Sequence, residues 1–288
     1  MHSSKERKRE EIPVFFLFCF GLALSEVKSK DGSNKKRKGA DMKIIISPAK
    51  KMVTDMESLP VESIPVFIDQ AARLMEVMRS LSYEEAKAVW KCSDKIAGEN
   101  YSRFQHMDLK RSLTPAILAY EGIQYQYMAP VVMERSALDY LRDHLRILSG
   151  FYGLLRPFDG VVPYRLEMQA KLPQGDLYGF WKDKIAEELC RGETEILNLA
   201  SKEYSRCISR HLPAHVRMTD VIFGDPDGRG GVREKGTYAK MARGEMVNFM
   251  AGRRIERLEE IVEFRRLNYH FSEELSSEYR YVFLRGPQ

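Results

Sequence analysis

The sequence predicts an α+β fold in which residues 42–288 form a single compact, mixed domain. Helical patterns and short β-branched runs alternate along this part of the chain without a regular βαβ period. No Pro/Gly-rich linker divides it. Hydrophobic residues make up 44% of the 288 residues, enough to bury a real core, and this excludes a disordered chain or a disulfide miniprotein.

The first elements follow from apolar spacing and capping signals. Lys43–Ser47 is a β-branched run closed by a proline, which predicts a buried strand. Apolar residues at steps of three and four predict a helix over 66–80. Ser82 with Glu85 forms a capping-box pattern, so a second helix is expected there, and Ser93 is placed to cap a third that runs toward residue 107.

Later elements are read in the same way. A helix opens at Ser136, with leucines at 138, 141, 145 and 148 as its apolar stripe, and another begins at Asp176 and runs through Leu189. The stretch 224–231 is rich in Gly and Asp and predicts a hairpin loop. Strands are expected over 117–120, 195–199, 216–223 and 281–284.

Residues 1–41 have the composition of an extension. A basic stretch precedes an apolar run from Val14 to Leu24, the outline of a secretory signal that is too short to span a bilayer. Residues 28–41 are polar and predicted to be disordered. The favoured interpretation is an upstream extension of the coding frame with Met42 as the working start, and an export signal is the alternative. No stable membrane association is expected.

Charge and cysteine usage narrow the function classes. Net charge is +5, but residues 1–41 contain ten basic and six acidic residues, which leaves 36 and 35 for residues 42–288. An anion site in the main domain must therefore be a local patch. The four cysteines are widely spaced, which is typical of reduced thiols in a cytoplasmic protein.

Three basic or mixed stretches are candidate binding segments. Lys50 and Lys51 directly follow the first strand, where ligand groups often lie, although a solvated turn is the alternative. Asp94 suits the start of a helix, and Lys95 beside it has no structural explanation. Lys240, Arg243 and Gly244 share a helical neighbourhood, and Gly244 is expected to leave space above the Lys240 ammonium group; a solvated basic face is the alternative.

The stretch 145–157 has the outline of a helix-hairpin-helix, in which backbone amides bind a phosphate. Gly150 and Gly153 are separated by two residues rather than one, and Pro157 would end the second helix early, so an ordinary glycine turn between core elements is the alternative. Further on, residues 164–167 alternate, which places Arg165 and Glu167 on one face if the segment is extended.

A metal site is not expected. Cys207, His211 and His215 have a suggestive spacing, but Pro213 interrupts the helix that would align them. No P-loop, dinucleotide fingerprint or Ser-His-Asp order is found, and no cofactor is expected.

Taken together, the motifs resemble those of the peroxide stress resistance protein YaaA family. The similarity spans about residues 42–285. One departure is local: where the family usually reads Phe-Lys-Gly-Asp-Val-Tyr, this chain has Tyr120-Glu121-Gly122-Ile123-Gln124-Tyr125. The matching segments are 46–50, 93–98 with Asn100, Arg103 and Phe104, 145–159, 163–168, 177–181, 198–204 and 238–244.

The resemblance implies a cytoplasmic protein of the hydrogen peroxide stress response that limits free-iron damage, and the first functional hypothesis is that this protein is not an enzyme. It also implies a positively charged cleft, a helix-hairpin-helix-like element and affinity for duplex or branched DNA. The residues add a physical route, since several phosphate contacts would follow if they gather. The phosphate-binding candidates are Lys50, Lys95, Gly150, Gly153, Arg156, Arg165, Lys240 and Arg243.

A second hypothesis is an enzyme that acts on a small anionic nucleotide or nucleobase in the same cleft. The candidate catalytic residues are Asp94, Lys95, Glu167 and Lys240. Their mixed signs suit an acid/base pocket better than a uniform phosphate groove.

Overall fold

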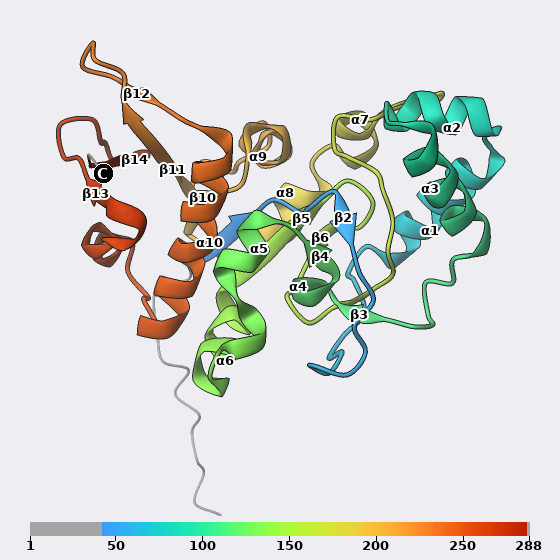
Figure 1. Cartoon of the computed structure of the whole chain (residues 1–288), viewed down its shortest axis with the longest axis horizontal. Helices are drawn as coiled ribbons and strands as arrows, with labels where there is room; N and C mark the ends of the chain where they lie inside the picture. Colours follow the sequence, from blue (N-terminus) through green and yellow to red (C-terminus); the bar gives the residue numbers. More distant parts are fainter. Residues whose placement is uncertain (1–41, 287–288) are drawn as a thin grey trace, which may run out of the picture. The chain divides into compact units, whose positions relative to one another are not determined.

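The computed structural model describes residues 42–286, which contain one mixed eight-stranded sheet with helices packed against it (Figure 1). The central five strands are parallel, and the outer pairings are antiparallel. Across the sheet the order is β13 (Tyr269–Phe271), β14 (Arg280–Arg285), β11 (Arg217–Pro226), β10 (Glu195–Leu199), β1 (Met42–Ile46), β5 (Leu145–Ser149) and β6 (Gly153–Leu155), with β12 (Val232–Arg233) paired to β11.

Helices and three small strand pairs complete the described part of the chain. The helices are α1 (Ile68–Ser80), α2 (Tyr83–Trp90), α3 (Asp94–His106), α4 (Ala116–Ala119), α5 (Ile123–Met128), α6 (Arg135–His144), α7 (Leu177–Trp181), α8 (Lys184–Leu189), α9 (Lys202–Ser209) and α10 (Gly236–Arg253), with 3-10 turns at Pro130–Val132, Leu258–Glu263 and Arg266–Asn268. The pairs are β2 (Lys51–Met52) with β4 (Tyr120–Glu121), β3 (Thr114–Pro115) with β7 (Gly160–Val161), and β8 (Lys171–Leu172) with β9 (Gly175–Asp176).

The strands at the centre of the sheet confirm the expectations from apolar runs. Ile44, Ile45 and Ile46 of β1 are fully buried, and Ile44 is in register with Leu197 of β10. Burial on both faces is typical of a parallel sheet covered by helices. The strands expected at 216–223 and 281–284 are also present, as parts of β11 and β14, and Asp227 Oδ1 accepts hydrogen bonds from the amides of residues 229 and 231 in the predicted hairpin loop.

The predicted capping hydrogen bonds are present at the start of α2 and absent at the start of α3. Ser82 and Glu85 form the predicted capping box at α2, with the Ser82 amide 2.8 Å from Glu85 Oε2. The helix α3 begins after Ser93 as expected, but the Ser93 side chain makes no capping hydrogen bond. The helix predicted over 66–80 is α1.

The helix-hairpin-helix expected over 145–157 is wrong. The helix that opens near residue 136 ends at His144, and Leu145–Ser149 continues as the buried strand β5, which turns through 150–152 into the antiparallel β6. Because both faces of β5 are covered, its leucines are buried. In the sequence they continue the apolar spacing of α6, although they lie on a strand. Gly153 has φ +73°, and Trp181 packs where its Cβ would lie, which makes this the glycine turn between core elements.

Two other element predictions are corrected. Residues 116–119 form the helix α4 rather than a strand; all four are buried, and a short apolar run does not distinguish the two. The helix expected over 176–189 is interrupted, because Lys182 has φ +49° and separates α7 from α8.

The buried apolar side chains form one continuous core across the described residues. No helix in the stretch 42–286 has the length and apolar character needed to cross a membrane. The expectations for residues 1–41 lie outside the described part of the chain.

Candidate functional site

The parallel strands β1 and β10 lie side by side, and the chain leaves them in opposite directions across the sheet. β1 is followed in the sheet by β5 on one side, and β10 by β11 on the other. In open sheets, ligands bind at the carboxyl ends of two such strands. Ser47 follows β1 and Ser201 follows β10, and the Ser201 amide donates to Ser47 Oγ at 2.8 Å.

A pocket of about 410 Å³ opens at this point. The Tyr125 hydroxyl donates to the carbonyl of Ser47 at 3.0 Å, which ties α5 to the end of β1. We call this cavity the switch-point pocket. It is lined by Ser47–Lys51, Glu121–Tyr125, Tyr164–Glu167, Ser201, Glu203, Tyr204, Lys240 and Arg243.

An ion-pair group lies on one wall of the switch-point pocket. Arg165 Nη2 is 2.9 Å from Glu167 Oε1, and Lys50 Nζ is 3.7 Å from the same oxygen. The side chains of Arg165 and Glu167 are each 13% exposed, whereas that of Lys50 is 67% exposed. The predicted placement of Arg165 and Glu167 on one face is therefore confirmed.

Three buried nitrogen donors on residues of this pocket have no hydrogen-bond partner among the described residues: Gln124 Nε2, Arg165 Nε and Arg243 Nε. Burial lowers the pKa of the Arg243 guanidinium, and Glu234 Oε2, 3.4 Å away, partly offsets this. Because buried donors are normally paired, their concentration here indicates a place for an acceptor-rich ligand.

Buried hydroxyl groups form a chain through Tyr164, which lines the pocket. Tyr164 OH lies 2.6 Å from Ser149 Oγ and 2.8 Å from Tyr120 OH. Burial raises the pKa of Tyr164 to about 12, so the hydroxyl stays protonated at neutral pH. These hydrogen bonds hold the uncharged Tyr164 side chain in a fixed position at the pocket.

A second hollow of about 580 Å³ adjoins the pocket and shares Lys50, Arg165 and Glu167 with it. We call it the basic hollow. The guanidinium groups of Arg206 on α9 and of Arg210 directly after it lie 5.4 and 5.8 Å from the Tyr178 ring centroid. Six cations line it, against two carboxylates: Lys50, Lys91, Arg165, Lys171, Arg206 and Arg210, with Glu167 and Asp176.

The structure brings together five of the predicted site residues: Lys50, Arg165, Glu167, Lys240 and Arg243 all line the switch-point pocket. Gly244 does not leave space above Lys240 as predicted. Its place is filled by α5, because a Cβ there would lie 2.2 Å from the backbone oxygen of Gln124.

Asp94 and Lys95 line neither hollow. Both are exposed at the start of α3. Asp94 Oδ1 accepts from Lys87 Nζ at 2.6 Å and from Tyr83 OH at 2.8 Å, and these bonds lower the pKa of its carboxyl group. The position of Asp94 is explained by this local pairing.

The turn at Gly150 and Gly153 is not a phosphate site. The amides of residues 151 and 152 donate to Ser149 Oγ at 3.2 and 2.8 Å, and both residues are fully buried. A Cβ on Gly150 would lie 2.3 Å from the Leu166 carbonyl oxygen. Gly150 instead lets the hairpin pack closely against the segment that carries Arg165, and Gly153 leaves room for Trp181 and Phe67.

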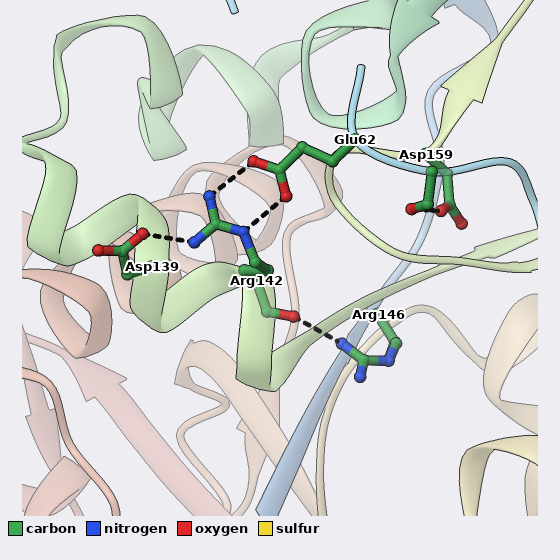
Figure 2. A network of polar contacts seen from close by, with 6 residues as sticks. Glu62, Asp139, Arg142, Arg146 and Asp159 are labelled. Carbon is green, nitrogen blue, oxygen red and sulfur yellow. Dashed lines mark hydrogen bonds and ion pairs between the residues drawn. The ribbon is translucent and has the colours of Figure 1, made fainter. Parts of the chain in front are cut away.

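Arg156 follows β6 directly, and its side chain is exposed. Its amide donates to Asp159 Oδ2 at 2.8 Å, and it lines neither hollow. Figure 2 shows the surroundings of Asp159, where Arg142 on α6 forms two bonds of 2.6 Å to Glu62 and also pairs with Asp139. This network holds the segment around residue 62 against α6, so it is structural.

The sequence reasoning did not single out Gln124, Ser201, Arg206 or Arg210. Ser201 had a usable signal, because it follows a buried strand just as Ser47 does. Arg206 and Arg210 are one helical turn apart, a spacing that occurs on any solvated helix.

Burial raises the pKa of the Glu203 carboxyl group above its ordinary value. A carboxyl whose folded pKa is raised destabilises the fold once it is ionised, and this penalty disappears as pH falls below about 4.5. Glu203→Gln is therefore expected to raise the melting temperature at pH 7 to 8, with the gain shrinking toward pH 4. Thermal melts across pH test this, and an equal gain at every pH would contradict it.

Among residues 42–286, no group of three or more His, Cys, Asp or Glu side chains is arranged to hold a metal ion. Cys207 is buried, and its thiol donates to the Tyr204 carbonyl at 2.9 Å. Burial raises the pKa of this thiol to about 12.

Comparison with known protein sequences places this chain in a family. The sequence model described as peroxide stress protein YaaA matches residues 42–275. A UPF0246 protein of Lachnoclostridium phytofermentans is 55% identical over 249 residues, covering 85% of this chain and 97% of that protein. Similar proteins of Desulfitobacterium hafniense and Agathobacter rectalis are 54% and 52% identical, each covering 85% of this chain and 98% and 99% of their own lengths.

Proposed function

The chain belongs to the peroxide stress protein YaaA family, which indicates a role in oxidative stress, and we propose that it fulfils this role by binding the phosphate backbone of duplex or branched DNA. The observation that carries this is the basic hollow, where six cations face two carboxylates. The residues outside 1–41 are nearly neutral in sum, so such a local excess is the feature that attracts a polyanion.

The arrangement suits contacts to phosphates rather than to base edges. Lys91, Lys171, Arg206 and Arg210 are exposed, so their charged groups are accessible to a strand lying over the hollow. Lys50 and Arg165 extend the positive surface into the switch-point pocket. Phosphate contacts fix orientation without reading sequence, so similar affinity for unrelated sequences is expected.

A salt series with labelled linear and branched duplexes tests the proposal. Four phosphate contacts predict that log K falls against log salt with a slope of about −3.6. The affinity should differ little between unrelated sequences. A flat salt dependence, or no binding at low salt, would contradict DNA binding. Limitation of free-iron damage remains a prediction of the family resemblance, checked by measuring chelatable iron in peroxide-treated cells with and without the protein.

A second candidate is an enzyme that acts on a small anionic nucleotide or nucleobase. The switch-point pocket favours it because Glu121, Glu167 and Glu203 line the same walls as Arg165 and Arg243. Paired charges of both signs suit proton transfer better than backbone binding alone. Of the predicted catalytic residues, Glu167 and Lys240 remain candidates, whereas Asp94 and Lys95 lie elsewhere.

A further inference from the structure

We infer that the switch-point pocket accepts one unstacked nucleotide from a nucleic-acid strand whose backbone lies along the basic hollow. The inference rests on the proposed function and adds a binding subsite to it. The two hollows share Lys50, Arg165 and Glu167. A strand held by phosphates in one hollow therefore has a neighbouring nucleotide at the mouth of the other.

The walls of the pocket fit a nucleobase. Ile123, Tyr125, Leu166 and Tyr204 supply apolar and aromatic surface, and the Tyr125 ring is fixed by packing 5.5 Å from the ring of Tyr120. A phosphate alone gains nothing from such walls, whereas a flat base has apolar faces that contact them. A base inside a duplex is stacked and cannot reach the pocket, so it must leave the stack.

The unpaired donors fit the polar parts of a nucleotide. Gln124 is 7% exposed, and its Nε2 has no partner among residues 42–286. A base edge offers the acceptor that this amide lacks. The unpartnered Nε atoms of Arg165 and Arg243 are charged donors, for which a phosphate is the matching acceptor.

Gln124 belongs to the segment 121–125, which lines the switch-point pocket. Glu121, Ile123 and Gln124 all line the switch-point pocket. We therefore assign the choice of base to this segment, with Gln124 as the positioning residue.

The experiment compares three duplexes of one sequence with the full chain: fully paired, with one mismatch, and with one abasic nucleotide at the same position. A mismatched base leaves the stack at a lower cost, so about tenfold tighter binding to the mismatched duplex is expected. The abasic duplex is equally weakened but offers no base, so it should bind like the paired one.

Gln124→Leu removes the donor with little change of volume, and it should reduce the mismatch preference by about fivefold, the effect of one neutral hydrogen bond. Gln126→Leu is the matched control on the same helix, because Gln126 is exposed and lines neither hollow. The control should keep the full preference, and both variants should keep the steep salt slope.

Several results overturn the inference. Equal binding of abasic and mismatched duplexes would show that the protein reads flexibility alone. Equal behaviour of the two glutamine variants would remove Gln124 from the site. Steep salt dependence without any mismatch preference would leave the proposed function standing and reject the subsite. Absence of duplex binding together with binding of a free nucleoside monophosphate would reject the strand and favour the small-ligand enzyme.

Discussion

Gly244→Ala is expected to lower the free energy of unfolding by about 3 kcal/mol, because the added methyl group overpacks a helix contact. The new Cβ would lie 2.2 Å from the Gln124 carbonyl oxygen and 2.9 Å from the Met128 amide, both of them backbone atoms. α5 and α10 must then move apart (Figure 1). Since α5 carries part of the switch-point pocket, ligand binding should weaken as well. Denaturant unfolding measures the change.

Gly98→Ala is the matched control for this prediction. Gly98 lies within α3, and no atom outside its own helical neighbourhood lies within 4 Å of its built Cβ. Alanine is the better helix former, so this variant should be stabilised by about 0.5 to 1 kcal/mol. If Gly244→Ala is instead as stable as Gly98→Ala, the close α5–α10 contact is not the reason for the glycine.

The elements that sequence patterns predicted are those whose causes are local. The capping box at α2 requires only Ser82 and Glu85, and β1 requires only its β-branched run. Leu145–Ser149 was predicted to be helical because β5 is buried on both faces and lacks the alternation of apolar and polar residues that marks a half-exposed strand. Its environment is created by β1 and α6, which no window of the sequence contains.

The candidate site divides in the same way. Lys50 was found because it follows a strand, and Arg165 with Glu167 because alternation places them together. Gln124 was named only as part of a segment that departs from the family pattern and not as a site residue, since its buried position arises from the packing of α5 against α10. Lys95 was included by its motif, yet the fold places it outside both hollows.

The double variant Arg206→Ala/Arg210→Ala is expected to reduce affinity for duplex DNA by roughly 10- to 100-fold at low salt. Each lost phosphate contact should make the slope of log K against log salt shallower by about 0.9, so a total change of about 1.8 is expected. Arg206 is exposed on α9 and Arg210 is exposed directly after it, so the fold should tolerate their loss. Fluorescence anisotropy across a salt series measures both quantities, and the loss should be nearly uniform across sequences.

Arg73→Ala/Arg135→Ala is the control for this double variant. Arg73 and Arg135 are exposed on α1 and α6 and line neither hollow, so their replacement removes the same two charges from other places. If the excess of cations in the basic hollow directs binding, only the Arg206/Arg210 variant changes the slope of log K against log salt by the amount expected for two lost phosphate contacts. Equal losses in the two double variants would mean that net charge alone attracts DNA. An unchanged slope in the Arg206/Arg210 variant would place the phosphate contacts on another face of the molecule.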